Sequence, residues 1–379
     1  MTSKPRRDYG EGAIYQRESD GRWVSSLRVN GKRKYYYGKT RDEVKQKLKK
    51  AQREQEQGIL ATGPKQTVQQ FLEYWLTVKK PTVKESTGAS HEWYVRQVFG
   101  ELGHVKLEKL TADMIQACYN TLQERLSSNT VRELHVILSS SLKDAVKWKR
   151  MTYNPCKDVK PPRAEKHDIQ FLTPEQVKDL LQSAQGTALE CLLTVAVTIG
   201  LRRGELLALR WSDINLERGS LHVRHTVSYV RVAGAGFRYV ETDPKTATSS
   251  RHITLPKIVV DALKAHKARQ VEQRWQAGSK WHENGLIFCD NEGGYYHIPA
   301  LYKQFMSILK RAGLPHMRFH DCRHTAATVL LIRGVNPKVV SEMLGHSSVV
   351  VTLNTYSHVI PTLQKSAMDE LDMLYTVAN

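Results

Sequence analysis

Near its end the chain reads His320-Asp321-Cys322-Arg323-His324-Thr325, then Leu344-Gly345-His346-Ser347, then Asn354-Thr355-Tyr356-Ser357-His358. Arginine, histidine and tyrosine thus follow one another in a short, ordered set of motifs. Further upstream the chain reads Thr198-Ile199-Gly200-Leu201-Arg202-Arg203-Gly204-Glu205, which adds another arginine. These residue types favour phosphate as the reacting group, because the planar guanidinium binds phosphate oxygens with two parallel donors and stays protonated.

Cleavage of a DNA phosphodiester without a metal ion has three requirements that such residues meet. The transition state needs fixed positive charge on its non-bridging oxygens, which arginines supply. A nucleophile must attack in line, and a tyrosine suits this task because phenoxide leaves more easily than an alkoxide, which keeps a covalent intermediate reversible. The departing 5′ oxygen needs a proton, which a lysine or a histidine donates.

Helix signals place several of these residues at helix ends. Arg202 lies between a helix expected to end near Gly200 and another expected to begin around Gly204. Its side chain would therefore project from a helix terminus into a cleft. His320 and Arg323 are three residues apart, which predicts that both lie on one face of a helix.

The last two motifs follow a further helix stop. A helix is expected to begin at Asn336-Pro337 and to end at Gly345, so that His346 emerges directly beyond it. Tyr356 follows ten residues later. Arg203, next to the upstream arginine of interest, is interpreted as an ordinary surface residue.

Between the upstream and downstream motifs the periodicity changes from helical to alternating. Three strands are expected, at Leu221–Val227, Phe237–Glu241 and His252–Leu255. Lys245 lies in the turn Asp243-Pro244-Lys245-Thr246 between the last two. A lysine in a turn is commonly just solvated, which is the plainer interpretation of Lys245.

The first sixty residues carry sixteen lysines and arginines but only eight acidic residues. Alternating patterns and turn signals predict three strands and a helix: Ile14–Arg17, Trp23–Val29, Lys32–Tyr37 and Arg41–Gln57. A small basic sheet backed by a helix fits a DNA groove, although a solvated sheet face is the plainer alternative. The candidate DNA contacts are Arg28, Lys32, Arg33 and Lys34.

The remaining segments predict the domain boundaries. Residues 66–160 show two apolar stripes at helical spacing, which indicate a helical core and no chemistry. The stripes are Val68, Phe71, Leu72, Trp75, Leu76 and Val131, Leu134, Leu138, Leu142, Val146. A proline-containing joint follows, and the helix start at Thr173-Pro174, with Gln176 completing a capping box, places the third domain from about Asp168. The expected domains are therefore 1–60, 66–160 and 168–379.

The bulk composition agrees with a polyanionic partner. The chain has 379 residues and a net charge of +19, which favours nucleic acid or another polyanion. Its five cysteines are scattered without a C-x-x-C pair, which favours reduced thiols. No apolar run approaches the roughly 20 residues of a membrane span, and the N-terminus lacks a signal-peptide core, so a soluble, cytoplasmic protein is expected.

The ordered motifs resemble the active site of the tyrosine recombinases, the phage integrase family. The resemblance implies a catalytic set of Arg202, Lys245, His320, Arg323, His346 and the nucleophile Tyr356. In relatives the lysine protonates the leaving oxygen, the first histidine assists proton transfer, and the second donates to a non-bridging oxygen. Glu205 matches the acidic residue usual beside the first arginine, and is interpreted as structural support that orients the arginines.

The same resemblance implies the architecture and the partners. It implies a small β-sheet-plus-helix arm-type DNA-binding domain, an all-α core-binding domain, and a mixed, mainly α catalytic domain with a C-terminal tail helix. The protein is then expected to be the integrase of a temperate phage or another mobile element, without a cofactor. It would act on double-stranded DNA as a homotetramer, with a host bending protein and a directionality factor as further partners. Its expected place is the bacterial cytoplasm, at the nucleoid when bound to DNA.

Three alternatives stay open at this stage. His316, His320, Cys322 and His324 crowd together and raise the question of zinc, although no C-x-x-C or H-E-x-x-H accompanies them. A type IB topoisomerase shares the chemistry but not the basic N-terminal domain. A DNA-binding regulator with an inactive site would bind DNA without covalent capture. Tyr375, a second C-terminal tyrosine, is interpreted as a core or interface residue.

Overall fold

The computed structural model describes residues 13–29, 32–56, 65–165, 169–232, 236–242 and 250–357, together with single positions and short pieces between 364 and 375. The chain divides into two compact units, Met1–Lys166 and His167–Asn379. Within the described part, no helix combines the length and the apolar character that crossing a bilayer requires.

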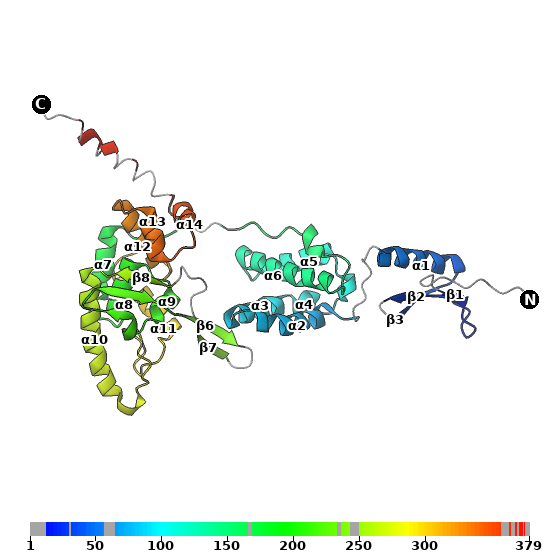
Figure 1. The fold of residues 1–379 in the computed structure, drawn as a ribbon, viewed down its shortest axis with the longest axis horizontal. Helices are drawn as coiled ribbons and strands as arrows, with labels where there is room; N and C mark the ends of the chain where they lie inside the picture. The colour runs from blue at the N-terminus through cyan, green and yellow to red at the C-terminus, as the bar shows by residue number, and fades with distance from the viewer. Residues whose placement is uncertain are drawn as a thin grey trace, which may run out of the picture. The chain divides into compact units, whose positions relative to one another are not determined.

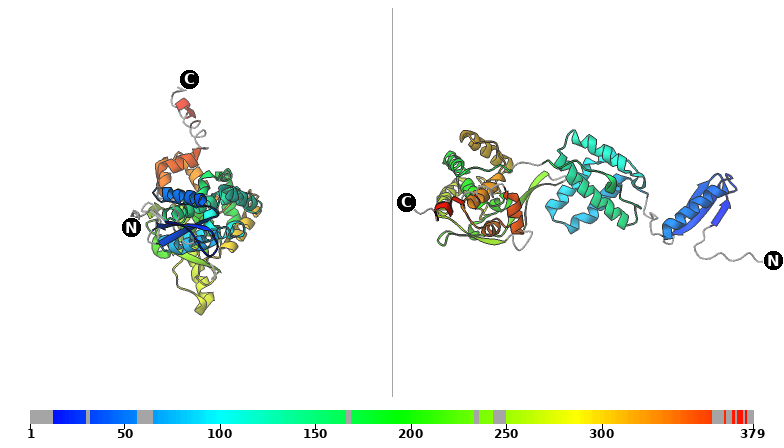
Figure 2. Two further views of the ribbon diagram at one scale, coloured as in Figure 1. Left: turned by 90° about the vertical axis from the view of Figure 1, so that its right-hand side faces the viewer. Right: turned by 90° about the horizontal axis from the view of Figure 1, so that it is seen from above.

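The first unit begins with a small antiparallel sheet in the order β1-β2-β3, followed by one helix that packs on it. These elements are β1 (Ala13–Gln16), β2 (Trp23–Val29), β3 (Lys32–Gly38) and α1 (Arg41–Glu56). Helix α1 lies across one face of the sheet and buries Leu27, Leu48 and Ala51 between them (Figures 1 and 2). The three strands and the helix predicted from alternation and turn signals are confirmed, within a residue at most boundaries.

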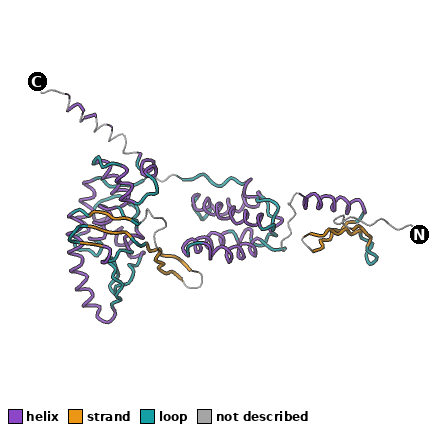
Figure 3. The backbone as a smooth tube through the Cα atoms, viewed as in Figure 1, coloured by secondary structure: helices purple, strands orange, loops and turns teal. Residues whose placement is uncertain are grey.

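Five helices follow in the first unit, and in Figure 3 this segment consists of helices and loops. They are α2 (Val68–Lys79), α3 (Glu85–Gln97), α4 (Phe99–Leu102), α5 (Ala112–Gln123) and α6 (Ser128–Lys147). The apolar stripes predicted as core are buried, apart from Val146, which is partly buried. The indole N–H of Trp75 donates to the Asp144 carboxylate at 2.8 Å, which ties α2 to α6.

The second unit is built around helix α8 (Glu190–Ile199), of which eight residues are buried. A helix that is apolar on all sides belongs in a core, and α8 packs against four other helices. Around it lie α7 (Pro174–Ala184), α9 (Arg203–Leu207), α10 (Lys257–Ala277), α11 (Ile298–Arg311), α12 (Asp321–Ile332), α13 (Pro337–Leu344) and α14 (Val349–Thr355). Figure 1 shows α12, α13 and α14 together at one side of this body.

The strands of the second unit form two separate sheets. One is three-stranded, in the order β4 (Ile214–Asn215), β5 (Ser220–Val223), β8 (Arg251–Thr254), and the other is the hairpin β6 (Thr226–Val232) and β7 (Gly236–Thr242). The single strand expected over Leu221–Val227 is therefore wrong. The chain leaves the first sheet after Val223 and enters the hairpin at Thr226, because the two halves pair with different partners.

The helix boundaries predicted from capping signals are confirmed. Thr173 caps α7 through a reciprocal pair of hydrogen bonds with Gln176, and Pro174 occupies the first helical position. Asn336 caps α13, and Gly345 ends it in the left-handed conformation. Capping residues act within one turn of chain, which is why the sequence alone located these ends.

Gly200 closes α8 with a φ of +72°, and a methyl group added there would meet Leu344 Cδ2 at 2.8 Å and Ala326 Cβ at 3.1 Å. Gly200→Ala is expected to lower the free energy of unfolding by about 2–4 kcal/mol, as backbone strain adds to overpacking. Gly186→Ala is the matched control, because its φ of +71° is equal but nothing lies near. Gly186→Ala should lower the free energy of unfolding by the backbone strain alone, about 1–2 kcal/mol. Equal losses in denaturant titrations of the two variants would contradict the account.

Candidate active site

Arg323 is the most deeply enclosed of the arginines singled out from the motifs. It lies in the first turn of α12 with only 3% of its surface exposed. Its Nη1 donates to the Gly200 carbonyl at 2.9 Å and its Nη2 to the Leu344 carbonyl at 2.7 Å. Both acceptors stand at helix C-termini, where carbonyls lack intrahelical partners. Arg323 therefore links α12 to the ends of α8 and α13.

Burial, and then the positive charge of Arg202, lower the pKa of Arg323 to about 9. The guanidinium remains protonated at neutral pH, but its charge is poorly compensated. A buried cation of this kind gains most from an incoming anion, because a low-dielectric site strengthens the attraction. This is the electrostatic condition that a phosphate-binding group requires.

Arg202 binds the loop at the end of α13, next to the Leu344 carbonyl that Arg323 contacts. As the N-cap of α9 it donates from its backbone N–H to the Glu205 carboxylate at 3.0 Å, and from Nη1 to the same carboxylate at 2.7 Å. Its Nη2 donates to the Gly345 carbonyl at 3.0 Å. The side chain is 39% exposed, so part of the guanidinium faces solvent. Arg203, by contrast, donates to the Tyr302 hydroxyl at 2.7 Å.

A third arginine, Arg251, was not singled out from the sequence. It begins β8 and is buried, with Nη2 donating to the Glu205 carboxylate at 2.9 Å and Nε donating to the Met343 carbonyl. Its burial could have been predicted from the sequence. Arg251 lies two residues before the inward-facing Ile253, and alternate residues of a strand share a face. Three arginines and one carboxylate thus surround the end of α13.

The buried carboxylate of Glu205 compensates part of the positive charge of these arginines. Burial alone would raise the pKa of its carboxyl group, but the hydrogen bond and charge of Arg251, followed by Arg202, outweigh burial and hold the pKa below its ordinary value of 4.5. The carboxylate therefore stays ionised and fixes both guanidinium groups. This contact geometry fits the supporting role expected for Glu205.

Glu205→Gln is expected to destabilise the protein by about 3 kcal/mol near pH 7, because two buried cations lose their counter-charge. A depressed pKa means that the carboxylate's contribution is complete above pH 4.5 and is lost as the pH falls below it. The difference between the two proteins should therefore shrink in acid. Thermal unfolding of both from pH 3 to pH 8 measures this, and a difference that grows in acid would contradict it.

Tyr356 closes α14 and is 2% exposed, packed with Ala327, Leu331, Val340 and Leu344. Its hydroxyl lies 3.0 Å from Nδ1 of His324. Burial raises the pKa of Tyr356 to about 12, with the charge of Arg323 acting in the opposite direction. The phenol is therefore protonated at neutral pH and must lose a proton in order to act as a nucleophile.

His346 follows Gly345 directly, as expected, and is half-buried. Its Nδ1 lies 2.7 Å from the Thr352 hydroxyl. Burial, followed by the charges of Arg323 and Arg202, lowers the pKa of His346 to about 4. In the neutral ring whose Nδ1 accepts from Thr352, Nε2 carries the hydrogen and is a donor at neutral pH.

His320 stands at the N-cap of α12 and is exposed, whereas Arg323, on the same helix turn, points inward. The ring of His320 meets that of His324 edge to face, with 5.2 Å between centroids. His324 is the second residue that sequence reasoning missed. Its place beside His320 could have been predicted from the sequence, because residues four apart share a helix face.

Lys245 lies outside the described residues, which resume at Ser250. The elements on either side of it are β7 and β8, which belong to different sheets. The segment that carries Lys245 therefore joins the hairpin to the three-stranded sheet.

The candidate DNA contacts of the N-terminal sheet divide between its two faces. Arg28 and Arg33 are cross-strand partners on the face opposite α1. Lys34 pairs with Leu27, on the face that α1 covers, and the side chain of Lys32 is outside the described atoms. The open face also carries three tyrosines that are 44–47% exposed and were not singled out from the sequence: Tyr15, Tyr35 and Tyr37.

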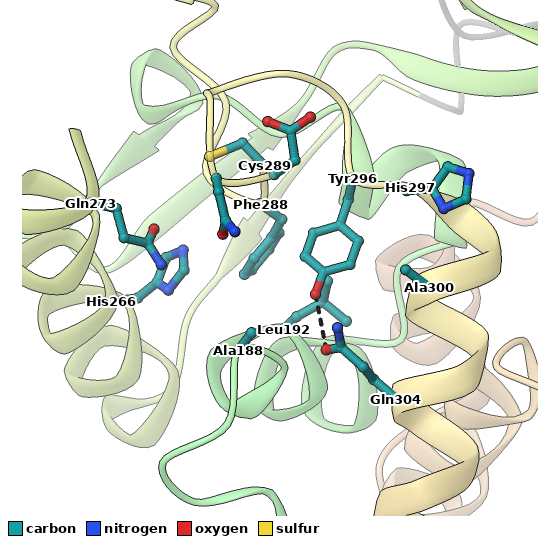
Figure 4. Close-up of a pocket in the computed structure, with 12 residues that line it drawn as sticks. Ala188, Leu192, His266, Gln273, Phe288, Cys289, Tyr296, His297, Ala300 and Gln304 are labelled. Carbon is teal, nitrogen blue, oxygen red and sulfur yellow. Dashed lines mark hydrogen bonds between the residues drawn. The ribbon is translucent and has the colours of Figure 1, made fainter. Parts of the chain in front are cut away.

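Neither a group of metal ligands nor a pocket adds residues to the candidate active site. No group of three His, Cys, Asp or Glu side chains in the described part of the chain is placed to hold a metal ion. Figure 4 shows a pocket between α8, α10, α11 and the chain around Phe288, in which Tyr296 donates to Gln304 at 3.0 Å. None of the motif residues lines it.

Comparison with known proteins agrees with the motifs. Residues 170–362 match the model of the phage integrase family, and residues 67–123 match that of the phage integrase N-terminal SAM-like domain. The chain is 33% identical over 365 residues to a XerC-like tyrosine recombinase of Caldanaerobacter subterraneus subsp. tengcongensis, covering 91% of this chain and 93% of that protein. It is 29% identical over 275 residues to the ICEBs1 integrase of Bacillus subtilis, covering 71% and 72%.

Solved structures share the fold. The Tn1549 transposon integrase in complex with transposon right end DNA superimposes with a TM-score of 0.66 at 24% identity, covering 80% of this chain and 99% of that one. A lambda integrase dimer bound to a core site superimposes with a TM-score of 0.57 at 18% identity, covering 93% and 96%. With motifs, family model and a relative of nearly full length in agreement, the chain belongs to the phage integrase family of tyrosine recombinases.

Proposed function

We propose that this site-specific recombinase integrates or excises a mobile element by forming a 3′-phosphotyrosyl bond through Tyr356. The observation that supports this most is the convergence of Arg202 and Arg323 on the carbonyls of Gly345 and Leu344, next to the tyrosine's own cluster. Two guanidinium groups held by one loop provide a cationic site for a single phosphate.

In the proposed reaction, Tyr356 Oη attacks the scissile phosphorus and the bond from phosphorus to O5′ breaks. Arg202, Arg323 and the Nε2–H of His346 stabilise the charge on the non-bridging oxygens. Lys245, assisted by His320, supplies the proton to the departing 5′ oxygen. The 5′-hydroxyl of the partner strand then attacks the phosphotyrosine, and a second round of exchange resolves the Holliday junction. One phosphodiester is exchanged for another, so no nucleotide is consumed.

We assign the domains in the order 1–60, 66–160 and 168–379. The first is proposed to bind arm-type DNA through the open face of its sheet, where Arg28 and Arg33 stand beside exposed tyrosines. Arginines supply phosphate and guanine contacts, and tyrosine rings supply apolar contact area. The helical segment is proposed to bind the core site.

The working assembly is proposed to be a homotetramer on two duplexes. Lambda integrase, which shares the fold, has been solved as a tetramer bound to a Holliday junction. Exposed apolar side chains in the tail, such as Met368 and Leu371, suit exchange between protomers. Most of the predicted tail helix lies outside the described residues. A host bending protein and a directionality factor complete the proposed partners.

The test is recombination of a supercoiled plasmid carrying one attachment site with a linear duplex carrying the other, in EDTA and without ATP. The proposal predicts joined products together with a transient protein–DNA adduct. A type IB topoisomerase would relax the plasmid irrespective of the site and join nothing. A regulator would retard both DNAs in a gel without any adduct. Either result would overturn the proposal.

A further inference from the structure

His324, which contacts Tyr356, is not among the catalytic residues assigned above. His324 Nδ1 and Tyr356 Oη are 3.0 Å apart, and their ring centroids 5.7 Å. The hydroxyl of a residue with 2% exposure is therefore in hydrogen-bond contact with a basic nitrogen. In this geometry the imidazole can accept the phenolic hydrogen.

We propose that His324 is a catalytic residue that takes the proton of Tyr356 during attack and returns it during rejoining. The inference rests on the proposed function, since it assumes that Tyr356 is the nucleophile. As Oη bonds to phosphorus, the O–H bond breaks and the proton moves to His324 Nδ1. When the 5′-hydroxyl displaces the tyrosine, its own proton goes back to the donor assigned above, and His324 returns the first proton to Oη. The leaving 5′ oxygen receives a different proton, from the donor assigned above.

The surroundings of His324 keep its ring uncharged. Burial, followed by neighbouring His320, lowers the pKa of His324 to about 4, and Arg318 and Arg323 act in the same direction against Asp321. The ring is thus neutral at physiological pH but only weakly basic, so the 3.0 Å contact of Nδ1 with the Tyr356 hydroxyl is what places it to receive the proton. Because the phenol is a weak acid in its buried site, attack without an acceptor would be slow.

The position of His324 keeps it near the reaction when DNA is bound. It is the residue directly after Arg323 on α12, so one helix turn carries both the phosphate-binding guanidinium and the proton acceptor. A phosphate held by Arg323 therefore brings Tyr356 Oη to the neighbourhood of His324. The other two histidines are placed differently: His346 Nδ1 contacts Thr352, and exposed His320 stands on the solvent side of His324.

The experiment measures single-turnover cleavage of a nicked suicide duplex by the full chain. In His324→Asn the amide oxygen takes the place of Nδ1 and keeps a hydrogen bond to Tyr356, but it is not basic. We expect cleavage to slow by about 100-fold or more, with DNA binding unchanged. His324→Gln is measured in parallel, so that a folding failure of one variant leaves the other. His316→Asn, at an exposed histidine outside the site, is the matched control.

One modified substrate and one modified protein separate proton acceptance from other roles of His324. With a 5′-bridging phosphorothiolate, whose sulfur leaves without a proton, the defect of His324→Asn should persist. With a fluorinated tyrosine of lower phenol pKa at position 356, the defect should shrink at least tenfold. Rescue by the phosphorothiolate would place His324 at the leaving group and overturn the inference. A cleavage rate within threefold of the unsubstituted protein would also overturn it. Absence of an adduct from the unsubstituted protein would instead refute the proposed function.

Discussion

Tyr356→Phe is expected to abolish covalent capture of DNA while leaving DNA binding intact. Phenylalanine retains the ring that packs with Leu331 and Leu344, and it loses only the hydroxyl that contacts His324. The loss of stability should therefore be about 1 kcal/mol, the typical net value of one hydrogen bond. Without an oxygen at this position, no phosphotyrosyl bond forms. Denaturing gels of a suicide substrate measure the adduct, and gel retardation measures binding.

The matched control is Tyr375→Phe. Tyr375 is the other C-terminal tyrosine and is 78% exposed, so its hydroxyl is free to reach solvent. Adduct formation by this variant should equal that of the unsubstituted protein. An adduct that persists in Tyr356→Phe and disappears in Tyr375→Phe would transfer the nucleophile to the tail and contradict the assigned site.

Arg323→Lys is expected to reduce single-turnover cleavage by about 1,000-fold. A guanidinium carries five N–H donors, of which Arg323 directs one to Gly200 and one to Leu344, so donors remain for a phosphate. An ammonium has three donors on one atom and cannot span these acceptors and a phosphate together. The positive charge is retained, so a loss of this size would identify guanidinium geometry as the cause.

Arg203→Lys is the control for this second prediction, because Arg203 contacts Tyr302 and not the loop at the end of α13. Its cleavage rate should stay within about threefold of the unsubstituted rate. Circular dichroism at the assay temperature would show whether both variants remain folded. A folded Arg323→Lys protein that cleaves within tenfold of the unsubstituted rate would contradict the role of Arg323.

The parts of the fold that the sequence predicted are those governed by local rules. Helix ends such as Thr173 and Gly345 depend on residues within one turn, and the N-terminal strands depend on alternation and tight turns. The strand break after Val223 was not predictable in this way. It depends on the choice of pairing partner, which is a property of the whole sheet.

The candidate site shows the same division. The motifs predicted a set of side chains that would be brought together, and four of its members lie around one loop: Arg202, Arg323, His346 and Tyr356. Lys245 lies outside the described residues, and His320 is exposed at the start of α12. The acceptors that hold the arginines are main-chain carbonyls, which carry no signal in the side-chain pattern. Arg251 enters through a buried ion pair with a distant residue, and its partner becomes evident only in three dimensions.

We propose that Tyr356 becomes covalently joined to the 3′-phosphate of the cleaved DNA strand. The most direct measurement digests the trapped adduct with protease and nuclease and identifies the modified peptide by mass spectrometry. We expect a nucleotide remnant on Tyr356 in the peptide that follows Lys338, and none in the Tyr356→Phe variant. A remnant on Tyr375, on a serine or on a histidine would contradict it.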